Sequence, residues 1–148
     1  MAGQADFSEA DWKRICRGPA AAALYVSYAS RGGAMKTVKE TKAIAAAYER
    51  ARKGGAVGQL LREAVADYPV IGADHNDSIE DIRQRLIDDV GAAWALVERH
   101  AHPSEAGEYR QFLLEIAQAV AAAAKGIDPD EANALSAIEA ALRPARWG

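Results

Sequence analysis

The chain has 148 residues, of which half are hydrophobic and about a quarter are charged, and its formal net charge is −3. This length and composition fit a single globular domain spanning residues 1–148, with short flexible tails expected at residues 1–6 and 144–148. A single cysteine excludes an internal disulfide, and the longest nearly uncharged run, residues 18–30, is too short to cross a bilayer. With an N-terminus that lacks a leader pattern, these features predict a cytoplasmic protein without a transmembrane segment.

Helices are predicted throughout, because alanine is abundant and no segment alternates like a strand. Ser8 is expected to begin the first helix, with Phe7 and Trp12 placed to form a hydrophobic staple around it. That helix is expected to end near residues 17–18, and Pro19 to open a second, buried helix that runs to residue 30.

Three further helices are predicted in the middle of the chain. Residues 35–53 repeat with a helical period, and residues 57–68 form a shorter helix that stops before Pro69. Asp77 and Glu80 make a capping box for the third, which runs to about residue 99. Its long apolar stripe makes it the candidate central helix and comprises Ile79, Ile82, Leu86, Ile87, Val90, Ala93, Trp94 and Val97.

The last two predicted helices form a hairpin with both ends marked in the sequence. The first of them begins at Ser104 and ends at Gly126, a residue suited to the left-handed conformation that closes helices. Asp128 as N-cap, Pro129 at the first helical position and Glu131 at the third then form a capping box. The predicted core faces comprise Tyr109, Phe112, Leu113, Ile116, Ala117, Val120, Leu135, Ile138 and Leu142.

The segments 24–48 and 117–140 share an order of parts: an Ala-rich helix, a glycine loop with a basic residue, and a helix with an early glutamate. In this alignment Glu40 corresponds to Glu131, although the first copy carries two extra residues. Either the two segments are a true repeat packed about a pseudo-two-fold axis, or two Ala-rich helices match by composition. The predicted fold is therefore an all-α compact bundle of six to seven helices, with two candidate pseudo-symmetric hairpins.

This pattern resembles the tellurite-resistance TerB-like family of small helical proteins, best over residues 111–143. The resemblance implies about seven helices with internal duplication, a role in stress-response or membrane-associated complexes, and, in some members, divalent-metal binding at acidic loops. The family loop usually reads Ala-Asp-Gly. In this chain Lys125 replaces that aspartate in the second copy, and Arg31 precedes the glycine in the first.

Two surfaces are candidate sites. Asp128, Asp130 and Glu131 could ligate a divalent cation, because clustered carboxylates suit hard ions. The simpler interpretation is that these acids cap the first turn of their helix, and Lys125 would repel an ion.

The second candidate is a basic segment between residues 31 and 62, where eight basic residues stand against two glutamates. This segment could face a polyanion, an acidic membrane surface or a protein partner, or pair with the acidic segment 67–89. Its candidate surface residues are Lys36, Lys39, Lys42, Arg50, Arg52 and Lys53.

No catalytic motif is present. His100 and His102 could chelate a metal only from an extended segment, and are interpreted as helix-terminal residues. Cys16 lacks a nucleophile signature and is interpreted as structural. We therefore expect a non-enzymatic cytoplasmic interaction protein that requires no cofactor and resembles TerB-like stress-response proteins. The alternatives are a divalent-metal-binding protein that uses the loop 125–131, and a small enzyme with an unrecognised site.

Overall fold

The computed structural model describes residues 3–29, 34–53, 58–69, 78–123 and 129–144. Helices account for almost all of the secondary structure in these residues, and none of the residues forms a strand. The elements are η1 (Gln4–Asp6), α1 (Glu9–Ala29), α2 (Ala34–Lys53), α3 (Gln59–Ala64), α4 (Ile79–His100), α5 (Pro103–Ala123) and α6 (Pro129–Ala141). The predicted all-α compact bundle is confirmed.

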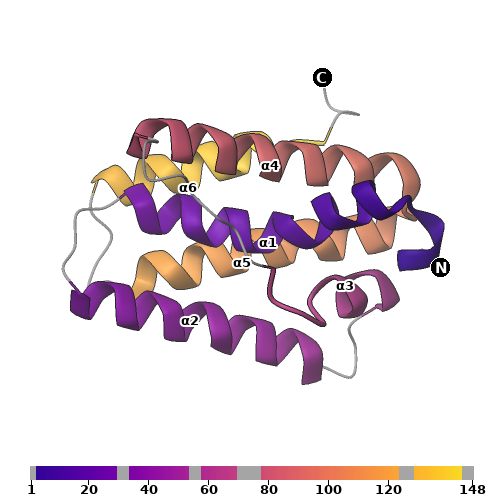
Figure 1. The fold of residues 1–148 in the computed structure, drawn as a ribbon, viewed down its shortest axis with the longest axis horizontal. Coiled ribbons are helices and arrows are strands. Elements are labelled where there is room, and N and C mark those ends of the chain that lie inside the picture. The colour runs from indigo at the N-terminus through magenta and orange to yellow at the C-terminus, as the bar shows by residue number, and fades with distance from the viewer. Residues whose placement is uncertain (1–2, 30–33, 54–57, 70–77, 124–128, 145–148) are drawn as a thin grey trace.

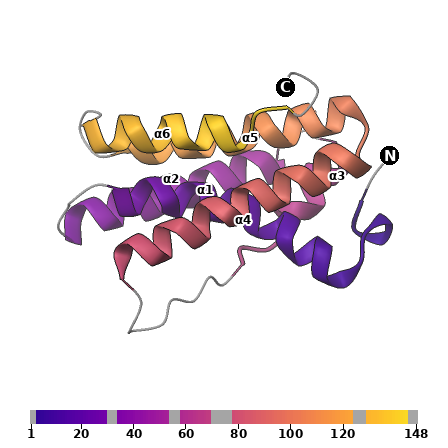
Figure 2. The same cartoon turned by 90° about the horizontal axis from the view of Figure 1, so that it is seen from above.

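The centre of the bundle is α1 and not α4, the predicted central helix: α1 packs most extensively against α4 and also contacts α5 and α6. Figures 1 and 2 show α3 at the same end of the bundle as the N-terminus, while α1 ends and α2 begins at the opposite end. There α5 also ends and α6 begins. None of the helices in the described part of the chain is long and apolar enough to span a membrane.

The helices predicted on either side of Pro19 form one continuous helix, so the predicted break at residues 17–18 is wrong. Proline has no N–H with which to bond the carbonyl of Ile15, four residues earlier. The Tyr109 hydroxyl of α5 donates to that carbonyl instead, at 2.6 Å. A Cβ at Gly18 would collide with the Tyr109 hydroxyl, so glycine provides the space for this contact. A partner distant in sequence therefore keeps the helix intact across its proline.

Serine caps begin α1 and α4. The Ser8 hydroxyl accepts from the Asp11 N–H at 3.1 Å, and the rings of Phe7 and Trp12 lie 5.9 Å apart, which confirms the predicted staple. In α4 the capping residue is Ser78, whose hydroxyl accepts from the Asp81 N–H at 3.1 Å. The predicted capping box at Asp77 and Glu80 is therefore replaced by a serine cap one position later, and Asp77 lies outside the described residues.

Helix α3 is shorter than predicted. It covers Gln59–Ala64 rather than residues 57–68. Arg52 of α2 donates from Nε to the carbonyl of Val65 at 2.7 Å, so a side chain of a different helix binds the chain where α3 ends. Within the predicted N-terminal tail, η1 packs against α3, and the Gln4 N–H donates to Glu63 Oε1 at 3.2 Å.

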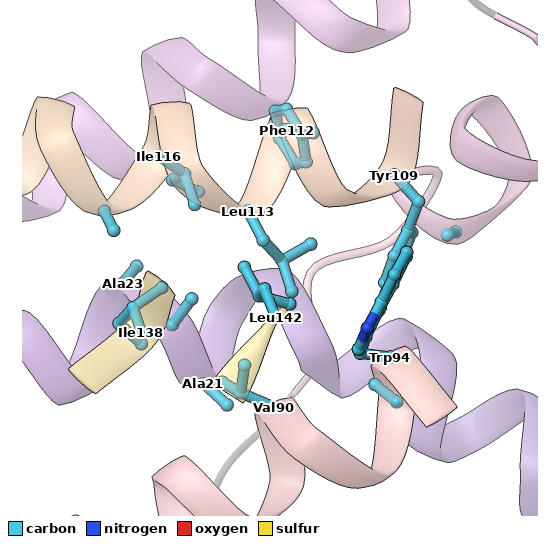
Figure 3. Close-up of a cluster of buried hydrophobic side chains, with 14 of the residues drawn as sticks. Ala21, Ala23, Val90, Trp94, Tyr109, Phe112, Leu113, Ile116, Ile138 and Leu142 are labelled. Atoms are coloured by element: carbon cyan, nitrogen blue, oxygen red, sulfur yellow. The ribbon is translucent and has the colours of Figure 1, made fainter. Parts of the chain in front are cut away.

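Every helix from α1 to α6 contributes buried residues to the core, and Figure 3 shows the part where α1, α4, α5 and α6 meet. The predicted faces of α4, α5 and α6 supply many of these residues. Ile82, Ile87 and Leu135 are only partly buried, and Ile79 is 62% exposed, so Ile79 does not belong to the core stripe. It is the first residue of α4, at the end of the bundle. The predicted core residues that are buried are Leu86, Val90, Ala93, Trp94, Val97, Tyr109, Phe112, Leu113, Ile116, Ala117, Val120, Ile138 and Leu142.

In each candidate hairpin, the second helix packs on the first helix of the other hairpin. The second helix of the first hairpin, α2, packs mainly on α5, and the second helix of the other, α6, contacts α1. Glu40 and Glu131, which correspond in the alignment, are both buried, and the Ser27 hydroxyl donates to Glu40 Oε1 at 3.2 Å. This arrangement fits a pseudo-two-fold relation, and the repeat itself stays a prediction.

Candidate functional site

The acidic cluster proposed as a metal site is only partly described. Asp128 and Lys125 lie outside the described residues. Asp130 is exposed, whereas its neighbour Glu131 is 1% exposed and lies in the core. Among the described residues no group of three or more histidine, cysteine, aspartate or glutamate side chains is placed to hold a metal ion. The metal site therefore stays a prediction. The burial of Glu131 in the core is typical of a residue with a structural role.

The predicted basic surface lies along α2. Lys39, Lys42, Arg50, Arg52 and Lys53 are all exposed, while the side chain of Lys36 is outside the described part. Two of these cations contact a glutamate of the same helix: Lys53 Nζ lies 2.8 Å and Arg52 Nη1 3.8 Å from the Glu49 carboxylate. The hydrogen bond and charge of Lys53 lower the pKa of Glu49, and the same contact raises the pKa of Lys53.

Both histidines of the predicted corner are exposed at helix ends. The His100 ring meets the Phe7 ring edge-on, with centroids 5.8 Å apart. His102 Nδ1 lies 2.9 Å from the Ser104 hydroxyl and accepts from the Ser104 N–H at 3.2 Å, at the start of α5. That hydrogen bond matches the expected helix-terminal role, because side-chain acceptors at this place satisfy the first amides of a helix.

Cys16 is a free, half-buried thiol on α1. Burial, with the charge of Asp67, raises its pKa to about 11. Burial raises the pKa of Tyr48 and of Tyr109 as well. A nucleophilic cysteine needs a lowered pKa, because the thiolate is the reactive species. The environment of Cys16 is therefore that of a structural residue.

A surface groove with a volume of about 350 Å³ lies between α2, α3 and α5. Its floor is apolar, made by Ala47 and Ala51 of α2, Leu61 of α3 and Phe112 of α5, all of them buried. Its rim is polar, and comprises Arg50, Glu108, Gln111 and Glu115. We call this hollow the α2–α5 groove.

The rim of the α2–α5 groove carries opposite charges on its two walls. Arg50 stands on the α2 wall, and Glu108 and Glu115 stand on the α5 wall. Glu108 Oε1 accepts from the Gly58 N–H at 2.8 Å, which ties the start of α3 to α5. Glu115 Oε1 accepts from Gln111 Nε2 at 3.3 Å. Within the described residues, neither Arg50 nor Glu115 has an ion pair.

The sequence indicated only one side of this groove. Arg50 was a candidate surface residue, whereas Glu108, Gln111 and Glu115 were not singled out. Their spacing along α5, at positions i, i+3 and i+7, is a signal that could have identified them, because residues at this spacing share one helix face. The contribution of α3 depends on tertiary packing, and no local pattern encodes it.

A second, smaller cleft of about 210 Å³ lies between α4, α5 and the chain after α6, and Trp94, Arg110 and Pro144 contribute to it. Its polar groups maintain the fold. Trp94 Nε1 donates to the Arg143 carbonyl at 3.2 Å, and Arg110 Nε donates to the Leu142 carbonyl at 2.7 Å.

Comparison with known proteins does not assign the chain to a family. No protein-family profile matches it, and searches of curated proteins and of solved structures find no match.

Proposed function

We propose that this chain is a non-enzymatic helical interaction protein and that the α2–α5 groove receives helices of a protein partner. The observation that carries the proposal is the composition of the groove. Its floor is buried and apolar, and its rim carries one guanidinium and two carboxylates. An apolar centre with a polar, charged rim is the usual anatomy of a protein interface.

The shape of the site also suits a helical partner. The walls are two long helices that run side by side, and small alanine side chains form much of the floor. Small residues allow another backbone to approach closely, and a helix face can lie in a groove between two others.

The chemistry of the groove supports binding rather than catalysis. Its lining includes no histidine, cysteine, serine or lysine, and the raised pKa of the Cys16 thiol weighs against the enzyme alternative. The resemblance to TerB-like proteins supports a role associated with the stress response. A single free cysteine is in keeping with the cytoplasmic location that we include in the proposal.

Site-directed photo-crosslinking tests this function. A benzophenone amino acid at Gln111, on the groove rim, is expected to form a crosslinked adduct in cells that make the protein. The same probe at Ala92, which is exposed on α4, is the matched control. Ala51→Arg, which fills the groove, should remove the Gln111 adduct while the circular dichroism spectrum stays unchanged.

The identity of the adduct then reports the partner. Equal adducts at Gln111 and Ala92, or an adduct that persists in the Ala51→Arg variant, would reject the groove as the docking surface.

A further inference from the structure

The two walls of the α2–α5 groove carry opposite charges along the same hollow. Glu108 and Glu115 lie two helical turns apart on α5, with Gln111 between them, so the three share one face. Arg50 lines the same groove from α2. All four residues therefore line the same stretch of the groove, Arg50 from one wall and the other three from the other. Yet no ion pair joins Arg50 to either glutamate within the subunit.

We propose that the partner in this groove is a second copy of the chain, bound as a symmetric dimer. The proposal rests on the proposed function, because it names the occupant of the same groove. A two-fold axis that runs along the groove, parallel to α2 and α5, exchanges the two walls and keeps each residue at its level. It therefore brings Arg50 of each subunit against Glu108 and Glu115 of the partner subunit.

Such a two-fold satisfies the requirement for a closed interface, in which one surface patch binds its own copy. It stacks α2 of each subunit on α5 of the other, so four helices pack around the joined grooves. One turn before Ala47 and Arg50 on α2 lie Ala43 and Ala46, and Ala46 is exposed. These small side chains permit close approach of the facing helices over a further turn.

The available area indicates a transient dimer. Helices of 20 and 21 residues are about 30 Å long, and two axes about 10 Å apart give a face about 20 Å wide. Each subunit then offers about 600 Å², or about 1,200 Å² for the pair, which is at the lower limit of specific interfaces. We expect a dissociation constant in the micromolar range.

Sedimentation velocity on the purified chain tests the dimer at about 5 to about 500 μM, a range that brackets such a constant. The wild type should shift from monomer to dimer as concentration rises. Arg50→Glu and Glu115→Arg should each weaken association at least about tenfold, because each places like charges together across the interface. The double variant Arg50→Glu/Glu115→Arg restores opposite charges, and should return association to within about threefold of the wild type.

Two controls make the same charge changes on other helices. Arg99→Glu on α4 and Glu139→Arg on α6 alter exposed residues outside the groove, and should leave association unchanged. Low ionic strength should strengthen the wild-type dimer, because its ion pairs are near solvent.

A wild type that stays monomeric at the highest concentration overturns the dimer. So does a dimer that the two single variants leave intact, since its interface then lies elsewhere. If the wild type is monomeric while Gln111 forms a groove-dependent adduct with a different protein, the proposed function stands and this inference alone fails.

Discussion

Tyr109 makes the hydrogen bond that Pro19 cannot make. In an unbroken helix the carbonyl of Ile15 would accept from the N–H of residue 19, and proline has none. The Tyr109 hydroxyl donates to this carbonyl at 2.6 Å, from a helix 94 positions away in sequence. The central helix of the bundle therefore depends on a side chain of α5 for its continuity.

Removing this hydroxyl should destabilise the protein measurably. Tyr109→Phe keeps the ring and leaves the buried Ile15 carbonyl without its donor, so we expect a loss of about 1–3 kcal/mol in unfolding free energy. Urea denaturation followed by circular dichroism measures it. Tyr68→Phe is the matched control, because Tyr68 is 44% exposed and its change should stay within about 0.5 kcal/mol. Equal effects of the two variants would contradict the role given to Tyr109.

Restoring the amide should rescue that loss. Pro19→Ala supplies an N–H at the position from which a regular helix bonds Ile15, so it should benefit the Tyr109→Phe protein more than the wild type. A double-mutant cycle in urea denaturation measures this coupling, which we expect at about 0.5–3 kcal/mol. Strictly additive effects would show that the two residues act independently.

The staple at the start of α1 should be a major stabilising contact. Trp12 is 7% exposed and packs beside Phe7, so Trp12→Ala should cost about 3–5 kcal/mol through lost burial and the cavity left behind. Thermal and urea denaturation measure the loss. Ile79→Ala serves as the control, since Ile79 is 62% exposed and its truncation should change stability by no more than about 0.5 kcal/mol. A small effect at Trp12 would show that α1 begins loosely.

Cys16 should react slowly in the folded protein. With its pKa raised to about 11, the thiol is almost wholly protonated at pH 8, whereas an unfolded cysteine has a pKa of about 8.5. Allowing for the greater nucleophilicity of a more basic thiolate, we expect labelling by a disulfide reagent at least about tenfold slower than in urea.

The raised pKa of Cys16 also makes the stability of the protein depend on pH. Because folding raises this pKa, the contribution of Cys16 to stability is present below about pH 8.5 and declines as the pH rises toward 11. The wild type should therefore lose more stability than Cys16→Ala between pH 8 and pH 10. In the labelling experiment, reaction of Cys16 in the folded protein as fast as in urea would contradict its buried environment.

Divalent cations should not stabilise the protein. Glu131 is buried in the core and Asp130 faces solvent, so ligation would have to draw these two carboxylates and Asp128 together. We expect millimolar Ca²⁺ or Mg²⁺ to leave the melting temperature unchanged. An ion present at one hundred times the dissociation constant of its site would add about 2.7 kcal/mol to the free energy of unfolding. A rise with metal that Asp130→Asn abolishes would instead support the metal-binding alternative.

Helix positions could be predicted from the sequence where the local signals are strong. The Ser8 cap, the Phe7–Trp12 staple and the position of Pro129 follow from residue types at fixed spacings, and the structure has all three. The core faces of α4 and α5 follow from periodicity in the same way. Local rules failed at Pro19, because the donor that preserves α1 there belongs to α5 and is distant in sequence.

The candidate site was less predictable than the fold. Arg50 was identified from the charge of its segment, but that charge is common to many solvated helices. What makes the α2–α5 groove a candidate site is the meeting of α2, α3 and α5 over Ala51, Leu61 and Phe112. Such a meeting depends on which helices pack together, and a periodic pattern specifies a face without specifying its neighbour.

The hydrogen bonds at the end of α6 give the protein an intrinsic optical reporter. The indole N–H of Trp94 donates to the Arg143 carbonyl, and Arg110 holds the preceding carbonyl of Leu142. If α6 detaches from α4 and α5, this indole loses its acceptor and part of its cover together. Its emission then shifts toward that of a hydrated tryptophan. In a protein where Trp94 is the only tryptophan, fluorescence would follow the docking of the last helix separately from global unfolding, without an attached dye.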